Sequence, residues 1–431
     1  MTALPMTVRR TLCLALAGLL TLSAAPLPAL AKTHAKAAPS KAQSKQREKE
    51  KAEAERAKAA EKAAAPGMPG IAARAWLLMD VTSGQILASQ NPDEKVEPAS
   101  LTKIMTAYLA FAALRDGKLK MDQQITPSTA VSKVGKDESR MFIEPAKPVA
   151  LQDLLRGLII QSGNDAAVAV AEAVGGTESG FVGMMNKEAE RLGMKNTHYM
   201  NAAGLPDPQH TTTVTDQAIL AASLIKDFPQ YYPFYSEKEY TYGGIRQPNR
   251  NRLLTLDPTV DGMKTGHTES AGYCLIASAH RPLALAGQPA GERRLLSVLV
   301  GAVTEAERIK ESAKLLNWGY EQTEAVRLYA RGQALDTVEV FKGAANSVKL
   351  GLQRDAIVSG LKGSTDRFKP VLERAAGKVI APVAAGQQLG LLKIMDGDKV
   401  AAQYPLVALD AVPQGGIFTR GWDTVRLWFK K

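Results

Sequence analysis

Three apolar runs late in the chain constrain its fold more than any other feature of the sequence. Val260 to Lys264, Tyr273 to Ala279 and Leu295 to Val303 have the length and composition of β-strands. A turn at His267 to Ser270 joins the first two, and connections this short join antiparallel neighbours. We therefore expect consecutive antiparallel strands in this part of the chain.

Amphipathic helices are predicted on both sides of these strands in the sequence. Leu101, Ile104, Met105, Tyr108 and Leu109 have the spacing of a helix that buries one face. Further elements are predicted as helices over 151–159, over 166–174 and over 305–320, and as a β-hairpin over 75–88. The combination predicts an α+β domain in which helices pack on an antiparallel sheet.

The N-terminus has the three parts of a secretory signal peptide. Arg9 and Arg10 supply positive charge, 11–22 form an apolar stretch too short to span a bilayer, and 29–31 form a small-residue cleavage site. The mature chain is expected to begin near Lys32, and the protein is expected to be exported.

Composition divides the rest of the chain. Lys, Glu, Ala, Gln and Arg dominate 32–69, which offers no apolar face to bury and is expected to be a flexible or transiently helical tether. Short apolar stretches between Gly, Asp and Pro turns predict a small all-β domain after the α+β domain. The predicted organisation is a signal peptide at 1–31, a tether at 32–69, the α+β domain at 70–325, the β domain at 326–413 and an amphipathic helix at 414–431.

The formal net charge of +11 does not indicate a nucleic-acid partner. Much of the basic excess lies in the leader, the tether and the last residues, which favours attraction to an anionic surface over a basic groove. The sequence also has no His-Glu-x-x-His string, no Walker-type loop and no paired cysteines, so neither a metal ion nor a cofactor is expected.

Three short strings carry the predicted chemistry: Ser100-Leu101-Thr102-Lys103, Ser162-Gly163-Asn164 and Lys264-Thr265-Gly266. Each is weak alone, because Ser-x-x-Lys recurs at 223–226 and 359–362 and Ser-x-Asn recurs at 89–91. Their context distinguishes them from these chance matches.

Ser100 follows Pro98-Ala99 at the start of the first strongly apolar helix. There its hydroxyl meets free N–H groups and the positive end of the helix dipole. Lys103 lies one turn further on, so its amine can reach Ser100. Burial and a second cation both lower the pKa of a lysine, and a neutral Lys103 can act as a base.

The other two strings are placed to complete a site. Ser162 and Asn164 fall between two predicted helices, where their side chains can project into a cleft. Lys264 and Thr265 end a predicted strand, and Gly266 removes a side chain where a substrate backbone would lie alongside.

The order and context of the strings resemble the penicillin-binding protein and serine β-lactamase superfamily. The stretches 97–106, 158–166 and 261–268 resemble the low-molecular-mass D-alanyl-D-alanine carboxypeptidases, and the likeness runs from about Ala75 to Tyr320 and more loosely to the C-terminus. The resemblance implies a transpeptidase-like α+β domain, a small all-β domain and a C-terminal amphipathic helix. It implies a serine-type D-alanyl-D-alanine carboxypeptidase that trims peptidoglycan stem pentapeptides and is acylated by β-lactams.

The resemblance also implies how the reaction proceeds. Ser100 attacks the carbonyl between two D-alanines with the help of neutral Lys103, and water then hydrolyses the acyl-enzyme. Ser162 relays a proton to the leaving amine, and Asn164 binds an amide of the acyl peptide.

The remaining implied roles concern binding of the substrate. Backbone N–H groups of Ser100 and His267 hold the oxyanion. Lys264 and Thr265 bind the terminal carboxylate. Arg250 adds to that positive site, and a plain surface or scaffold arginine is an equally supported alternative.

Three other functions compete with this one. A class A β-lactamase needs a Glu-x-x-Leu-Asn loop, and no such string occurs. A D,D-endopeptidase is chemically closer, although that relative generally lacks the terminal domain and anchor. A cell-wall-binding protein without activity has no use for all three strings in order.

The last residues predict a helix that lies on a membrane surface. The stretch is too short and too charged to span a bilayer, which needs about 20 mainly apolar residues. One side carries Ile417, Phe418, Trp422, Val425, Trp428 and Phe429, and the other side or the flanks carry Arg420, Asp423, Thr424, Arg426 and Lys431. We expect a peripheral protein on the periplasmic face of the bacterial cytoplasmic membrane, and a helix docked on the β domain is the alternative.

Overall fold

The computed structural model describes residues 41–65, 67–283 and 291–429. The predicted signal peptide and residues 32–40 of the predicted tether lie outside the described residues. The chain divides into two compact units, 1–51 and 52–431. In the first unit the described residues, 41–51, are helical.

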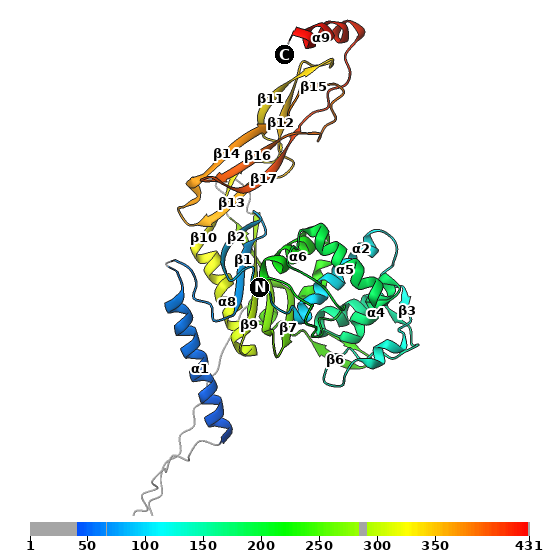
Figure 1. Ribbon diagram of the computed structural model, residues 1–431, viewed down its shortest axis with the longest axis vertical. Coiled ribbons are helices and arrows are strands. Elements are labelled where there is room, and N and C mark those ends of the chain that lie inside the picture. Colours follow the sequence, from blue (N-terminus) through cyan, green and yellow to red (C-terminus); the bar gives the residue numbers. More distant parts are fainter. Residues whose placement is uncertain (1–40, 66, 284–290, 430–431) are drawn as a thin grey trace, which may run out of the picture. The chain divides into compact units, whose positions relative to one another are not determined.

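An antiparallel five-stranded sheet forms the centre of the larger domain (Figure 1), with the strand order β2-β1-β9-β8-β7. Its strands are β1 (Ala75–Asp80), β2 (Gln85–Gln90), β7 (Val260–Thr268), β8 (Gly272–Leu283) and β9 (Gly291–Ala302). The predicted hairpin and the predicted antiparallel strands are confirmed, and β1 pairs with β9 to join them.

Both faces of this sheet are covered by helices. Successive side chains of a strand point to opposite faces, so neighbouring residues of β1 pack against different helices. In β1, Leu77 packs with the helices between β2 and β7, whereas Trp76 and Leu78 pack with Leu315 and Leu316 of α8 (Glu305–Gln322). The predicted α+β class is confirmed.

The chain between β2 and β7 is mainly helical and carries two of the three strings. Its helical elements are η1 (Ala99–Thr102), α2 (Lys103–Arg115), η2 (Thr129–Lys133), α3 (Leu151–Arg156), η3 (Gly157–Gln161), α4 (Asn164–Gly175), α5 (Glu178–Leu192), α6 (Val214–Asp227), η4 (Tyr232–Ser236) and α7 (Leu253–Leu256). Two small antiparallel two-stranded sheets are formed by β3 (Gln124–Ile125) with β4 (Val149–Ala150) and by β5 (Glu239–Tyr242) with β6 (Ile245–Pro248). The segment predicted as one helix over 151–159 is α3 followed by the π-helical turn η3.

A separate all-β domain follows α8. Its elements are β10 (Thr323–Tyr329), β11 (Ala334–Phe341), β12 (Ser347–Gly351), β13 (Ala356–Leu361), η5 (Thr365–Arg367), β14 (Phe368–Arg374), β15 (Val379–Ile380), β16 (Gln388–Asp396) and β17 (Lys399–Ala408). Six strands form a sheet in the order β14-β16-β17-β12-β11-β15, and β10 pairs with β13. Leu392 and Ile394 alternate with the less buried Lys393, as expected for a strand with one face in a core.

The predicted tether contains a continuous helix, α1 (Lys41–Ala63). It lacks an apolar face, as the sequence indicates, and contacts α8 through polar groups instead. Arg56 donates to Glu307 at 2.7 Å, and Lys314 forms an ion pair with Glu61. These contacts order a segment whose composition alone predicts a flexible or transiently helical tether.

The C-terminal helix α9 (Ile417–Phe429) contacts the β domain through its polar side. The backbone N–H of Lys342 donates to Asp423 at 2.6 Å, and Arg426 donates to Glu339 at 2.6 Å. Among the described residues, no helix is both long enough and apolar enough to cross a membrane.

Candidate active site

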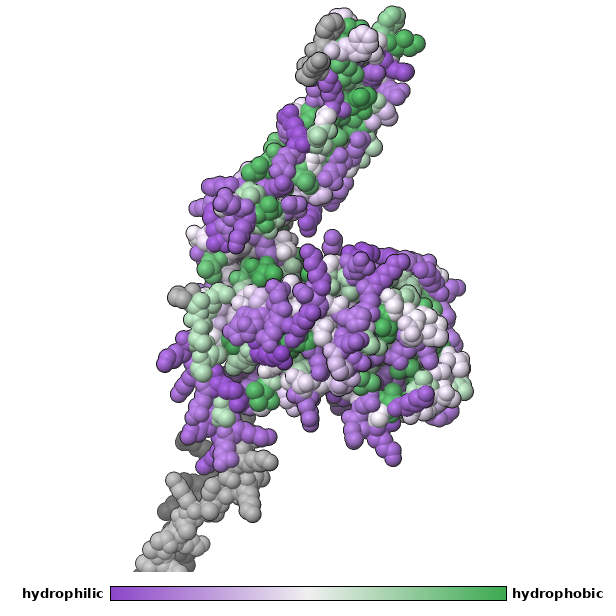
Figure 2. Space-filling view, in the orientation of Figure 1, coloured by the Kyte–Doolittle hydropathy of each residue, from purple (hydrophilic) through white to green (hydrophobic). Residues whose placement is uncertain are grey.

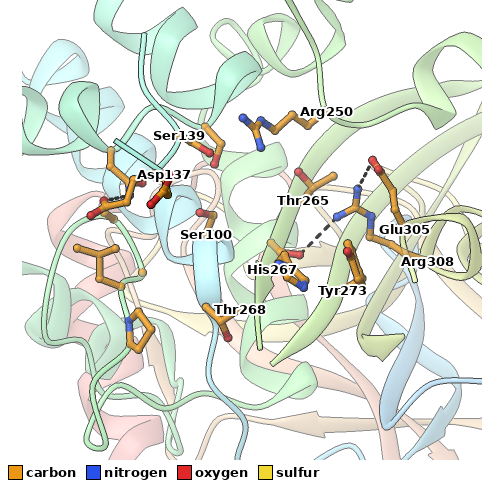
Figure 3. A pocket seen from close by; sticks show the side chains of 18 residues that line it. Ser100, Asp137, Ser139, Arg250, Thr265, His267, Thr268, Tyr273, Glu305 and Arg308 are labelled. Atoms are coloured by element: carbon orange, nitrogen blue, oxygen red, sulfur yellow. Dashed lines mark hydrogen bonds and ion pairs between the residues drawn. The ribbon is translucent and has the colours of Figure 1, made fainter. Parts of the chain in front are cut away.

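The three strings meet at one cavity of about 370 Å³. Its lining includes five of their residues, namely Ser100, Ser162, Asn164, Thr265 and Gly266, and also His267, which follows the third string. Figure 3 shows Ser100 between the segment that carries Asp137 and Ser139 and the strand that carries Thr265 and His267. The two lysines of the strings, Lys103 and Lys264, are not among the described residues that line the cavity, and both are buried.

Ser100 lies in η1, a short 3₁₀ turn that precedes α2. Two glycines permit the close approach of this turn to its neighbours. A Cβ on Gly204 would lie 1.8 Å from the carbonyl oxygen of Ala99, and a Cβ on Gly266 would lie 3.3 Å from the backbone nitrogen of Ser100. The missing side chain of Gly266 therefore makes room for the turn that carries Ser100, in addition to the cavity that Gly266 lines.

Lys103 makes three hydrogen bonds from its buried amine. Its Nζ donates to Ser100 Oγ at 2.9 Å, to Asn164 Oδ1 at 2.7 Å and to the carbonyl oxygen of Ala203 at 2.6 Å. The amide and carbonyl oxygens can only accept, whereas a hydroxyl can also donate. When Lys103 is neutral, its two N–H groups can stay on these two oxygens while its lone pair accepts from the Ser100 hydroxyl.

The surroundings of Lys103 favour this neutral form. Burial, followed by the positive charge of Arg250, lowers the pKa of Lys103 from 10.5 to about 7. Glu138 and Asp165 oppose these effects. The pKa shift and both of its physical causes agree with the sequence argument for a lysine that is neutral near pH 7.

Ser162 occupies a strained position between η3 and α4. Its backbone lies in the left-handed region, with φ of 65°, which side chains other than glycine rarely adopt. Its Oγ is buried and has no hydrogen-bond partner among the described residues. A buried hydroxyl that is unsatisfied at a cavity wall can bind a group that enters the cavity.

Glu138 is a cavity residue that the sequence argument missed. Its Oε2 accepts a hydrogen bond from Asn164 Nδ2 at 2.5 Å, and Asn164 contacts Lys103 on its other side. No sequence motif includes Glu138, because it lies in a loop and its partner Asn164 follows 26 residues later.

The third string lies within β7, which continues to Thr268 beyond the predicted strand end. Thr265 and His267 line the cavity, and the ring of His267 packs on that of Tyr273 with a centroid distance of 4.0 Å. Lys264 instead donates to the carbonyl oxygen of Thr265 at 3.0 Å. Burial, followed by the positive charge of Lys103, holds the pKa of Lys264 well below its usual value.

Two arginines contribute positive charge to the cavity wall. Arg250, which the sequence left open as a site or scaffold residue, is one of the lining residues. Arg308 of α8 is the second and was not predicted from the sequence. It donates to Glu305 at 2.9 Å, as Figure 3 shows, and also to the carbonyl oxygen of Gly266 at 3.4 Å. Its position in the first turns of a predicted helix does not indicate that it lines the same cavity as β7.

The chance matches lie elsewhere. Ser223 is in α6 and Ser359 is in β13, where its hydroxyl donates to Asp80 at 2.7 Å. Ser89 and Asn91 lie at the end of β2. None of these residues is among the described residues that line the cavity.

The chain matches known proteins over both of its domains. A family model described as D-alanyl-D-alanine carboxypeptidase matches residues 59–302. A second, described as the C-terminal domain of penicillin-binding protein 5, matches residues 324–414.

Individual relatives and solved structures give the same result. The D-alanyl-D-alanine carboxypeptidase DacC of Escherichia coli is 40% identical over 366 residues, which are 84% of this chain and 89% of that protein. DacA of Haemophilus influenzae is 40% identical over 365 residues, with 84% and 91% covered. The crystal structure of penicillin-binding protein 5 from Haemophilus influenzae matches with a TM-score of 0.70 at 39% identity, over 81% of this chain and 100% of that chain. The chain therefore belongs to the D-alanyl-D-alanine carboxypeptidase family.

Proposed function

We propose that the protein removes the terminal D-alanine from peptidoglycan stem peptides through an acyl-enzyme at Ser100. Membership of the family supports this serine-type carboxypeptidase reaction. The observation that carries the assignment of the nucleophile is the 2.9 Å contact between Ser100 Oγ and the buried amine of Lys103 at the cavity. The same nucleophile would be acylated by β-lactams.

The proposed reaction begins when Ser100 Oγ attacks the carbonyl carbon between the two D-alanines and its proton passes to Lys103 Nζ. Backbone N–H groups of Ser100 and His267 would stabilise the oxyanion. The C–N bond then breaks, and the leaving amine takes a proton relayed by Ser162, whose Oγ has no other partner among the described residues. Water hydrolyses the ester of Ser100 and releases the shortened peptide.

The free carboxylate of the leaving D-alanine would bind where the cavity is positive. Thr265, Arg250 and Arg308 line this part of the cavity, although Glu305 offsets part of the charge of Arg308. Lys264 lies behind the wall and contacts Thr265, so we propose that it acts there through that residue and through its charge when protonated. Charge-assisted hydrogen bonds of this kind contribute roughly 1.5–3 kcal/mol.

Hydrolysis of matched peptides tests the proposed substrate. The parent enzyme is expected to release D-alanine from a peptide ending in D-alanyl-D-alanine, and to act at least about tenfold more slowly on the same peptide with a C-terminal amide. Arg250→Gln and Arg308→Gln are expected to reduce the rate on the carboxylate more than on the amide. Equal rates on both peptides in the parent enzyme would contradict the carboxypeptidase assignment.

We also propose that α9 attaches the protein to the periplasmic face of the cytoplasmic membrane. Figure 2 shows hydrophobic side chains on the surface over α9. Phe418 is 94% exposed, Trp428 84% and Trp422 68%, while Asp423 is buried against the β domain. The helix thus combines a docked polar side with an apolar side directed to the solvent, which suits insertion into a membrane surface.

A further inference from the structure

We propose that Glu138 is a positioning residue for acyl transfer, because it holds the amide of Asn164 in the orientation that leaves the lone pair of Lys103 facing Ser100. The inference rests on the proposed function, since the orientation matters only if neutral Lys103 takes the proton of Ser100. Glu138 itself is not expected to touch the reacting atoms.

The hydrogen bonds around Asn164 fix which side of its amide faces the lysine. An ionised carboxylate can only accept hydrogen bonds, so the group 2.5 Å from Glu138 Oε2 must be the Nδ2 donor. The carbonyl oxygen Oδ1 is then left to face Lys103, where it accepts from Nζ at 2.7 Å. Without Glu138, both orientations of the amide would find partners, because the lysine amine can donate and, when neutral, accept.

The orientation of the Asn164 amide determines which part of the Lys103 amine remains available to Ser100. A neutral amine has two N–H groups and one lone pair. Asn164 Oδ1 and the carbonyl oxygen of Ala203 take the two N–H groups. Only the lone pair then remains for Ser100. A reversed Asn164 would direct N–H donors at Lys103 and would compete with the hydroxyl for that lone pair.

The segment 135–143 holds Glu138 firmly in this position. Its other carboxylate oxygen accepts from the backbone N–H of Gly135 at 3.0 Å. The backbone N–H of Asn164 donates to the carbonyl oxygen of Ser139 at 2.7 Å. Asp165 accepts from three successive backbone N–H groups, those of residues 141–143. These contacts tie the segment to the start of α4, so Glu138 and Asn164 are fixed relative to one another.

Glu138 also affects the charge balance around Lys103. The positive charge of Arg250 and the negative charges of Glu138 and Asp165 act on the amine. Glu138 raises the pKa of Lys103, so its removal should lower that pKa further below about 7. Acylation should accelerate with pH as Lys103 loses its proton. Loss of the carboxylate is therefore expected to move this rising limb to lower pH.

Acylation by a fluorescent penicillin, followed from about pH 5 to 9, separates positioning from charge. Glu138→Gln keeps the size of the side chain, removes the negative charge and can both donate to and accept from Asn164. Its plateau rate at high pH is expected to fall by about tenfold, which is the effect of one lost charge-assisted hydrogen bond, and its rising limb is expected to move to lower pH. Asp137→Asn is the matched control, since it removes a neighbouring cavity carboxylate but leaves the contact between Glu138 and Asn164 intact.

The result that supports the inference is a reduced plateau and a lowered limb in Glu138→Gln, with a smaller loss of plateau rate in Asp137→Asn. A parent-like plateau in Glu138→Gln, an equal plateau loss in both variants, or a limb that stays in place would overturn it. The parent enzyme in the same assay keeps the two hypotheses apart. If the parent is acylated and Glu138→Gln behaves identically, only this inference fails, whereas a parent that is not acylated contradicts the proposed function.

Discussion

The proposed chemistry of Lys103 depends on the surroundings of its amine. Lys103 is 1% exposed and contacts three acceptors, of which only the hydroxyl of Ser100 can reverse its role and donate. The proposed function of Lys103 as a base requires a pKa near the working pH, and burial is the largest cause that lowers its pKa.

Replacement of Lys103 by arginine tests this dependence directly. Arginine keeps the positive charge but has a pKa above about 12, so it cannot supply a neutral base. Lys103→Arg is expected to reduce the rate of acylation by a β-lactam by at least about 10²-fold, the usual contribution of general base catalysis. Stopped-flow measurement of acylation tests this, and Lys226→Arg in the chance match on α6 serves as the control. A rate near that of the parent in Lys103→Arg would exclude Lys103 as the base.

Sequence reasoning at this scale finds residues that belong to strings and misses those that do not. Ser100, Ser162, Asn164 and Thr265 are brought to one cavity, as the three strings suggest. Glu138 belongs to no recognisable sequence pattern, because its hydrogen-bond partner Asn164 lies 26 residues away. Its place becomes visible only once the fold brings its segment against α4.

At the scale of elements, α9 is the clearest case of a helix with two different sides. Its polar side satisfies a backbone N–H of the β domain through Asp423, and Phe418, Trp422 and Trp428 on its apolar side are exposed. From the sequence, membrane attachment and docking on the β domain are alternative predictions for this helix. The position of α9 in the structure is compatible with both at once.

Substitution of the exposed face alone separates the two roles of α9. Phe418→Ser, Trp422→Ser and Trp428→Ser together are expected to reduce binding to vesicles that contain anionic lipid by at least about tenfold, since a buried aromatic side chain contributes roughly 1.5–3 kcal/mol. The polar contacts of Asp423 and Arg426 remain, so the thermal unfolding temperature should stay that of the parent. Co-sedimentation with vesicles measures the effect. The anchor proposal fails if the triple variant sediments like the parent.

The spacing of apolar residues predicts several helices and strands correctly. Helices that are marked mainly by an N-cap residue are missing from that prediction. The helices α5 and α6 were not predicted, although Thr177 and Thr213 are N-caps whose hydroxyls accept from backbone N–H groups three residues on. Phe181, Met185 and Ala189 also follow the spacing of one helix face. The helix α1 was described only as a tether because its partners are charged groups on α8, which no local pattern reveals.

At the scale of the whole molecule, a buried polar cluster joins the catalytic and β domains. Arg293 on β9 donates to Asp80 at 2.7 Å and to the side chain of Thr323 at 2.8 Å. The hydroxyl of Ser359 on β13 donates to the same Asp80 oxygen at 2.7 Å. Asp80 is fully buried, so the hydrogen bonds within this cluster must offset the energetic cost of removing its polar groups from water.

Removal of Asp80 is therefore expected to destabilise the protein strongly. Asp80→Ala leaves the buried guanidinium of Arg293 without its carboxylate, which should lower the free energy of unfolding by about 3–5 kcal/mol. Denaturant-induced unfolding measures this change. Asp116→Ala removes a carboxylate from the exposed pair with Arg115 and should leave the unfolding midpoint unchanged. Equal effects of the two substitutions would show that the buried cluster does not stabilise the molecule.

Covalent labelling tests the central claim most directly. The purified chain without residues 1–31 is incubated with benzylpenicillin, its intact mass is measured, and the modified peptide is sequenced by mass spectrometry. We predict one adduct of one penicillin mass, located on Ser100, that is absent from Ser100→Ala and present in Ser223→Ala. An adduct that persists in Ser100→Ala, or a parent protein that forms none, would contradict the account.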